Sequence, residues 1–236
     1  MRIERRHTLV SCLSLVVALA SLADAAPAIA NDFVAPAPLL DEHRQDASET
    51  AVLAGGCFWG VQAVYQHVKG VSRAVSGYAG GAKDTAIYEK VGSGRTGHAE
   101  AVEITFDPKI VSYGTVLQIF FSVAHNPTEL NRQGPDVGTQ YRSAIFTRDP
   151  EQRRIAEAYI AQLDKAGVYK KPIVTQVNGA DPFYAAEAYH QDYATLHPRQ
   201  PYIVFNDQPK IDALKRLFPD QARDKPVLLG AAGKGE

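Results

Sequence analysis

The chain has 236 residues, of which 45% are hydrophobic and 22% charged, and its formal net charge is −1 at pH 7. This size and composition are ordinary for one large globular domain or two small ones. The balanced charge gives no reason to expect nucleic acid as a partner, which would need a basic face. Two cysteines, Cys12 and Cys57, are too few for a multi-disulfide scaffold or a four-cysteine zinc site.

Residues 1–30 have the pattern of an export signal. Three arginines in the first six positions precede an uncharged, mainly apolar run over residues 8–23, and small-residue cleavage patterns end at Ala25 and Ala30. The run is shorter than the roughly 20 residues of a membrane span, so we expect cleavage rather than an uncleaved anchor. The interpretation predicts an exported protein, in a bacterium a periplasmic one. Cleavage would remove Cys12 and leave Cys57 as the single cysteine.

The remaining chain divides into three parts by composition. Residues 31–48 are rich in Ala and Pro and then charged, with no sustained period, and are predicted to be a flexible lead-in. Residues 49–219 form the predicted domain. Residues 220–236, which end in small and charged residues, are predicted to be a flexible tail.

Within the domain, strand and helix patterns alternate in chain order. Apolar runs predict strands over 51–54, 71–78, 99–106, 141–146 and 172–177, and a long Gly-rich loop over 77–97. Helical spacing predicts helices that begin at or just after Cys57, over 113–124, from Asp149-Pro150 to Gly167, and over 183–196. This order predicts an α+β fold in two layers, with helices packed on a mixed or antiparallel sheet.

Cys57 lies where the first strand, a Gly-Gly turn and the first helix meet. A thiol at a helix N-terminus is close to free backbone N–H groups, which favour a thiolate and can lower its pKa. The glycines on both sides let the backbone turn tightly. A buried, inert cysteine among core aromatics is the alternative. The position favours a nucleophile.

Glu100 is the second candidate residue, because it shares one face of a predicted strand with Val102, Ile104 and Phe106. A carboxyl on a core-facing strand is desolvated, which raises its pKa and keeps a proton available for donation. The alternative is that Glu100 ends the strand and points into solvent.

Three further motifs do not support a site. Residues 92–97 fit G-x-G-x-x-G, but a strand follows them where nucleotide binding needs a helix. His98-Ala99-Glu100 lacks the C-x-x-C of zinc deaminases. Glu187-x-x-His190 is a single E-x-x-H where a di-iron bundle needs two, so we interpret it as a polar helix face. No metal site is predicted.

Four segments resemble the signatures of the peptide methionine sulfoxide reductase A family. They are Gly-Cys-Phe-Trp-Gly at 56–60, Gly-His-Ala-Glu-Ala at 97–101, Gly-Thr-Gln-Tyr-Arg-Ser at 138–143, and the segment from Phe183 to Gln191. The resemblance covers roughly residues 51–218 and implies a ferredoxin-like two-layer fold. It also implies an oxidoreductase that repairs proteins under oxidative stress.

The resemblance implies a role for each of seven residues. Cys57 is the nucleophile that attacks the sulfoxide sulfur and becomes a sulfenic acid. Phe58 and Trp59 form the pocket for the S-methyl group. Glu100, with the hydroxyls of Tyr88 and Tyr141, holds and protonates the sulfoxide oxygen, and Asp136 is a substrate-side contact. The implied substrates are free and protein-bound methionine-S-sulfoxide.

The chain departs from many relatives of that family because no cysteine stands near its C-terminus, where they carry recycling cysteines. After removal of the leader, an internal disulfide is impossible. The expected reductant is therefore an external thiol, either a thioredoxin-like protein or a small thiol. No bound cofactor and no nucleic acid are expected, and we expect a monomer.

Two other functions are compatible with the residues. A low-pKa cysteine also reacts with peroxide, so a thiol peroxidase is one alternative. A non-catalytic module that binds oxidised methionine is the other.

Overall fold

The computed structural model describes residues 33–42 and 44–231. In this part of the chain six strands form one sheet in the order β7-β6-β1-β3-β2-β8, and a separate hairpin pairs β4 with β5. Neighbouring strands of the sheet are antiparallel except β6 and β7, which are parallel. The strands are β1 (Glu49–Gly55), β2 (Val71–Ala79), β3 (Ala99–Phe106), β4 (Arg132–Gln133), β5 (Asp136–Val137), β6 (Ser143–Phe146), β7 (Gln176–Asn178) and β8 (Phe183–Ala185).

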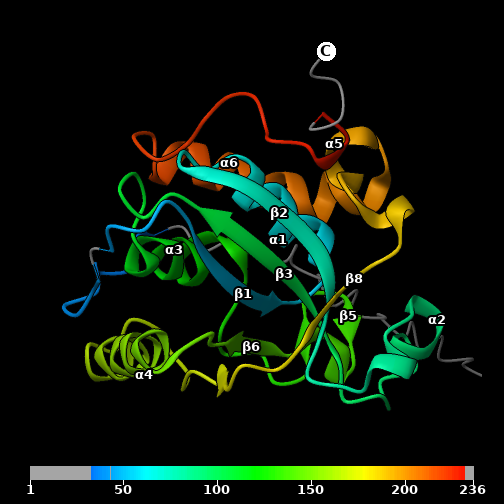
Figure 1. The fold of residues 1–236 in the computed structure, drawn as a ribbon, viewed down its shortest axis with the longest axis horizontal. Helices are drawn as coiled ribbons and strands as arrows, with labels where there is room; N and C mark the ends of the chain where they lie inside the picture. The colour runs from blue at the N-terminus through cyan, green and yellow to red at the C-terminus, as the bar shows by residue number, and fades with distance from the viewer. Residues whose placement is uncertain (1–32, 43, 232–236) are drawn as a thin grey trace, which may run out of the picture.

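Helices of very different length surround this sheet. In Figure 1 the strands β1, β2 and β3 curve across the middle of the molecule, with α5 and α6 above them and α4 below. The helices are α1 (Phe58–Gln66), α2 (Tyr88–Val91), α3 (Tyr113–Ile119), α4 (Pro150–Lys165), α5 (Tyr193–Leu196) and α6 (Gln208–Leu217). Among the described residues, no helix combines the length and apolar character needed to span a bilayer. The arrangement confirms the predicted α+β fold.

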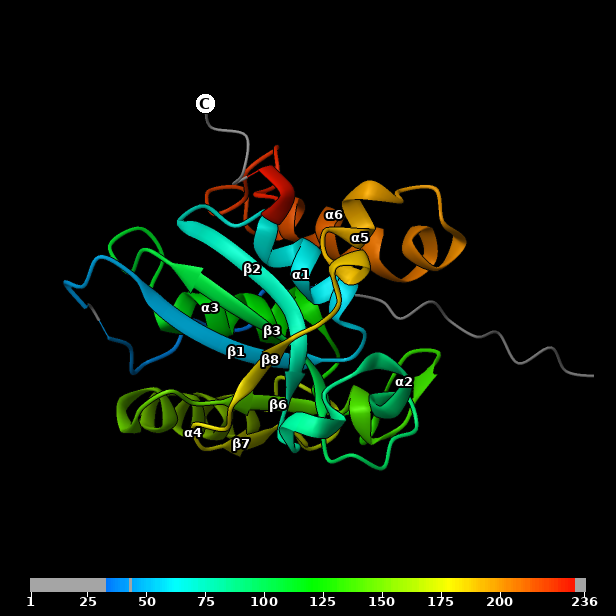
Figure 2. The same cartoon turned by 45° about the vertical axis from the view of Figure 1, so that its right-hand side comes forward.

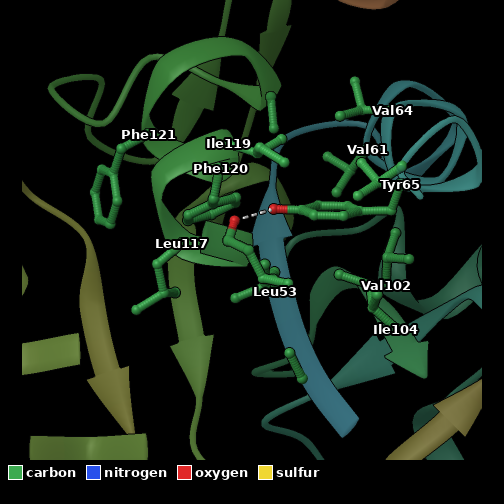
Figure 3. Packing of buried hydrophobic residues seen from close by; sticks show 14 of the residues in the cluster. Leu53, Val61, Val64, Tyr65, Val102, Ile104, Leu117, Ile119, Phe120 and Phe121 are labelled. Atoms are coloured by element: carbon green, nitrogen blue, oxygen red, sulfur yellow. Dashed lines mark hydrogen bonds between the residues drawn. The ribbon is translucent and has the colours of Figure 1, made fainter. Parts of the chain in front are cut away.

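One large apolar core joins the helices to the sheet. Leu53 of β1 and Val102 and Ile104 of β3 pack against side chains of α1, α3 and the π-helical turn Phe120–Ala124 (Figure 3). Tyr65 of α1 is fully buried there, and its hydroxyl donates to the carbonyl oxygen of Val116 at 2.8 Å. The bond satisfies a polar group that would otherwise be costly to bury, and it holds α1 at a fixed distance from α3.

Several predicted elements are where the sequence places them. β3 covers residues 99–106, α1 begins directly after Cys57, and Asp149 caps α4 by accepting from the backbone N–H of Gln152 at 2.9 Å. The predicted strands at 141–146 and 172–177 are shorter than expected, since only residues 143–146 and 176–178 pair. The predicted loop 77–97 contains α2, and α3 ends in the π-helical turn.

The helix predicted over 183–196 is wrong. Residues 183–185 form β8, which pairs antiparallel with residues 77–79 of β2, and the two run side by side in Figures 1 and 2. A 3-10 turn over 188–190 and the short α5 follow. Asp192 between them is left-handed, with φ of +58°, which stops one continuous helix. Pairing to the sheet edge outweighs the local helical spacing.

The two segments predicted to be flexible are packed where the structure describes them. The lead-in runs across α3 and α4, with the Ala35 N–H donating to Ser122 Oγ at 2.9 Å. The tail follows α1, where the Arg223 N–H donates to the carbonyl oxygen of His67 at 2.7 Å. Their partners are backbone atoms and polar side chains of distant elements, which leave no periodic pattern in the sequence. Residues 1–32, with the predicted export signal, lie outside the described part.

Candidate active site

Cys57 is the N-cap residue of α1, at the end of the turn that follows β1. Gly56 has φ of +90°, and a Cβ there would lie 2.5 Å from the Cβ of Gln133. A Cβ on Gly55 would approach His125 and Phe120 to 3.0 Å. Gly56 is therefore required by close packing as well as by its backbone conformation, whereas Gly55, the last residue of β1, has little room for a side chain. Cys57 itself is 8% exposed.

Gln133, whose side chain packs against Gly56, belongs to the β4–β5 hairpin. The Gln133 side chain accepts from the Asn126 N–H at 2.9 Å and donates to the Asn126 carbonyl oxygen at 2.7 Å. Gln133 pairs with Asp136 across the hairpin. The Asp136 carboxylate accepts a short hydrogen bond from the hydroxyl of Tyr202. The hairpin thus places Asp136 on the side of the Cys57 turn.

Glu100 lies on β3 with its side chain turned inward, as the strand alternation predicts. It is 3% exposed, and its Oε2 accepts from the backbone N–H of Phe58 at 3.1 Å. Burial is the main cause that raises the pKa of Glu100 to about 8, while the Phe58 bond acts in the opposite direction. A carboxyl that holds its proton at neutral pH thus lies against the residue that follows Cys57.

The predicted lowering of the Cys57 pKa is wrong for the free site. Burial raises the pKa of the thiol, Glu100 would raise it further once ionised, and the Trp59 backbone N–H lowers it only partly. The backbone N–H at the start of α1 lowers the pKa of Cys57 as expected, but desolvation raises it by more. The resting site therefore holds a neutral thiol beside a neutral acid.

Both predicted tyrosines lie near this pair. Tyr88 begins α2, and Tyr141 ends the 3-10 turn Thr139–Tyr141. Burial is the first cause that raises the pKa of each phenol, and the charge of Glu100 is the second. The hydroxyls therefore stay protonated and can donate hydrogen bonds toward Glu100 and Cys57.

Phe58 and Trp59 differ in depth. The Phe58 ring is 1% exposed and packs 5.8 Å from Tyr78 and 5.0 Å from the ring of His190. The Trp59 indole is half-buried and stacks on Tyr193 with the ring centroids 3.9 Å apart. Tyr202 meets its edge at 6.0 Å. Phe58 is the floor of the aromatic group, and Trp59 is its wall facing solvent.

The sequence reasoning missed the segment that covers the other side of α1. Asp207, fully buried, pairs with Lys210 at 3.4 Å, and a Cβ on Gly60 would lie 2.1 Å from the Asp207 Oδ1. Opposite charges three residues apart were a visible signal for such a pair on a helix. No signal in the sequence pointed to Tyr202, because its partners Asp136 and Trp59 are distant in sequence. Over the described residues, no group of three or more His, Cys, Asp or Glu side chains is arranged to hold a metal ion.

Comparison with known proteins identifies the family. The profile described as "Peptide methionine sulfoxide reductase" matches residues 49–222. A protein from Mesorhizobium japonicum called peptide methionine sulfoxide reductase MsrA 2 is 63% identical over 193 residues, which are 82% of this chain and 99% of that protein. The chain belongs to the peptide methionine sulfoxide reductase A family. It is an oxidoreductase that reduces methionine sulfoxide, as the resemblance implies.

Solved structures of the same family have a similar fold. Methionine sulfoxide reductase A of Corynebacterium diphtheriae is 33% identical with a TM-score of 0.55, over 74% of this chain and 86% of that one. Mxr1 of Saccharomyces cerevisiae in reduced form is 29% identical with a TM-score of 0.58, over 69% and 92%.

Proposed function

We propose that Cys57 and Glu100 carry out the reduction, with the S epimer of methionine sulfoxide as substrate, free or within a protein. The observation that carries the proposal is the 3.1 Å bond from the Phe58 N–H to Glu100, which fixes a neutral acid beside the residue after the nucleophile. Tyr88 and Tyr141 would share the sulfoxide oxygen with Glu100. Trp59 and Phe58 would receive the S-methyl group, and Asp136 would contact the substrate chain.

The proposed step transfers one oxygen atom between two sulfurs. The Cys57 sulfur attacks the sulfoxide sulfur, Glu100 gives its proton to the sulfoxide oxygen, and the thiol proton of Cys57 restores Glu100. Methionine leaves as the thioether, and the oxygen remains on Cys57 as a sulfenic acid. The sulfoxide sulfur gains two electrons and the Cys57 sulfur loses two. The raised pKa of Glu100 supports its role as donor.

Regeneration would use an external thiol. Cys57 is the free cysteine of the described residues. A first external thiol would condense with the sulfenic acid to form a mixed disulfide and water, and a second would release Cys57. A thioredoxin-like protein or a small thiol fits this chemistry. Export remains a proposal as well, supported by the pattern of residues 1–30.

Mass analysis of the reduced protein tests the proposal. One equivalent of methionine-S-sulfoxide without reductant should yield one methionine and one added oxygen at Cys57. The R epimer should leave the mass unchanged. Methionine formation from neither epimer would refute the function, and faster oxidation by peroxide than by sulfoxide would favour a thiol peroxidase. The N-terminus of the protein recovered after export would show whether the leader is removed.

A further inference from the structure

Gly60, the last residue of the Gly-Cys-Phe-Trp-Gly segment, lies inside α1, where a glycine lowers helix stability. Packing explains it, because a Cβ there would clash with the Asp207 carboxylate and lie 2.9 Å from Lys210 Nζ. Both side chains come from the segment beside α1, where the turn Ile203–Asp207 continues into α6 (Figures 1 and 2). The glycine therefore makes room for two charged groups within one helical turn of Cys57.

Stability alone does not explain this ion pair. Asp207 is 0% exposed and Lys210 7% exposed, and their charged groups are 3.4 Å apart. Among the described residues, Asp207 Oδ2 has no hydrogen-bond partner. Removing two charges from water is costly, and well-packed apolar side chains of similar volume often give an equally or more stable protein. The pair therefore points to a role in the adjacent site.

The charge of Lys210 acts on Asp136. Burial is the main cause that raises the pKa of Asp136, whereas the Tyr202 hydrogen bond and then the charge of Lys210 lower it. The other titratable groups that face Asp136 are Cys57, Tyr88, Glu100, Tyr141, Tyr202 and Asp207. The thiol, the phenols and Glu100 keep their protons at neutral pH, so Lys210 is shared between the carboxylates of Asp207 and Asp136.

The same segment supplies the hydroxyl that holds Asp136. Tyr202 directly precedes the turn Ile203–Asp207, and its hydroxyl donates to the Asp136 carboxylate. Asn206 Nδ2 donates to the Tyr202 carbonyl oxygen at 3.0 Å, which ties the tyrosine to the turn. One short stretch of backbone therefore carries both a hydroxyl donor and a cation that act on Asp136.

The chemistry of Asp136 limits what it can contact. An ionised carboxylate only accepts hydrogen bonds, and a sulfoxide oxygen has no proton to donate. Within a methionine sulfoxide residue the donor is the backbone N–H. The half-buried Asp136 can therefore bind the substrate through this N–H.

We propose that Lys210, seated on Asp207 in the space left by Gly60, is a positioning residue that aligns the Asp136 carboxylate toward the backbone N–H of the oxidised methionine. The inference deepens the proposed function and rests on it, because Asp136 contacts the substrate there. Lys210 itself acts only through Asp136.

The test compares two substrates, N-acetylmethionine-S-sulfoxide and dimethyl sulfoxide. Both present a sulfoxide with an S-methyl group, but dimethyl sulfoxide has no N–H. Lys210→Met removes the charge and retains an unbranched side chain. Because this variant leaves the buried Asp207 unpaired, a second variant combines Asp207→Asn with Lys210→Met and removes both charges. Lys215→Met is the matched control, since Lys215 is exposed on the same helix.

In both Lys210 variants we expect the KM for N-acetylmethionine sulfoxide to rise about tenfold, with a smaller change in kcat. The kinetic constants for dimethyl sulfoxide should change less than about twofold. The acid limb of kcat/KM for the N-acetyl substrate should move to higher pH, because Asp136 without the charge of Lys210 binds its proton more tightly. Lys215→Met should match the unchanged protein.

A double-mutant cycle tests whether Lys210 acts through Asp136. In an Asp136→Asn background, Lys210→Met should have no further effect on KM. Additive effects would overturn the proposal. Equal losses for the two sulfoxides would also overturn it, since general damage to the fold predicts them, and so would a native KM in both Lys210 variants.

A binding measurement separates this proposal from the proposed function. If the unchanged protein reduced neither sulfoxide, the proposed function would fall. The emission of Trp59, the single tryptophan of the chain, would still report the dissociation constant of N-acetylmethionine sulfoxide. Binding about tenfold weaker in Lys210→Met but not in Lys215→Met would support the role of Lys210, and equal binding would overturn it.

Discussion

Two buried glutamates at opposite ends of neighbouring strands differ in their surroundings, and one of them, Glu100, is the proposed proton donor. Glu100 starts the inward face of β3, and Glu49 starts β1, opposite Phe106 at the far end of β3. The six residue steps from Glu100 to Phe106 correspond to roughly 20 Å along the sheet. Glu100 is 3% exposed and Glu49 is 6% exposed.

Burial raises the pKa of both carboxyls, to about 8 for Glu100 and about 7 for Glu49. A raised pKa therefore does not by itself distinguish the proposed proton donor, Glu100, from Glu49. Glu49 accepts from the Gln152 side chain at 2.8 Å and lies in a group with Glu42 and Arg44. Glu100 lies beside a thiol and two phenols instead. The two carboxyls therefore differ in their neighbours, because only Glu100 lies beside the Cys57 thiol.

The largest expected effect is a loss of activity on substitution of Cys57, which lies beside Glu100 and far from Glu49. Cys57→Ser should reduce turnover of methionine sulfoxide by at least about a thousandfold, because a serine hydroxyl is a far weaker nucleophile toward sulfur than the Cys57 thiol. Circular dichroism and the melting temperature should stay close to those of the unchanged protein. Residual activity above a tenth of the original would place the chemistry elsewhere.

A matched pair of substitutions tests the comparison directly. Glu100→Gln should slow the single-turnover reduction step by about a hundredfold, because the amide has no acidic proton to donate. Glu49→Gln should leave that rate unchanged. Equal rates for the two variants would show that Glu100 has no special role.

The pH dependence of stability should be shared by both carboxyls. Between an unfolded pKa of about 4.3 and the raised native value, the native state retains a proton that the unfolded state has lost. The free energy of unfolding should therefore fall as pH rises through this range.

Denaturant titrations across this range would measure the fall. Glu49→Gln should flatten the slope up to its native value of about 7, and Glu100→Gln up to about 8. Each variant should then be more stable than the unchanged protein in mild alkali. A slope that neither substitution alters would mean that other groups control the dependence.

The smallest expected effect concerns Arg44, the charged neighbour of Glu49. The Arg44 guanidinium donates to Glu42 Oε2 and to Asp149 Oδ2, each at 2.6 Å. The Arg44 side chain is 28% exposed and the Asp149 side chain 31% exposed. Arg44→Gln should lower the free energy of unfolding by up to about 1 kcal/mol and leave sulfoxide reduction unchanged.

Arg154→Gln is the control for that measurement, since its pair with Glu151 is more exposed and should contribute less. A loss of catalytic rate in Arg44→Gln would mean that the two ends of the sheet are coupled.

The sequence predicts the centre of the site well because its signals are local. Cys57 follows a strand and a Gly-Gly turn, and Glu100 shares a strand face with apolar residues, so both placements depend on neighbours within a few positions. The pKa of Cys57 was predicted in the wrong direction, since its burial arises from the whole fold. The same limit applies to residues 183–185, which become a strand only because the edge of β2 is free to pair.

The contacts that complete the site join distant parts of the chain. Trp59 meets His190 and Tyr202, and Tyr202 meets Asp136. No periodicity of one sequence encodes such pairs. The family resemblance supplied Asp136, Tyr88 and Tyr141, whereas His190 was interpreted as a surface residue.

The lead-in across α3 and α4 affects where the folded unit begins. The family match starts at Glu49, yet the fully buried Ser122 receives its bond from the backbone of Ala35, and Tyr159 donates to the carbonyl oxygen of Pro36 at 2.8 Å. A chain shortened to the matched region would expose these groups along with the apolar surface around them. The recognisable domain is therefore smaller than the unit that needs to be expressed to obtain a well-packed protein.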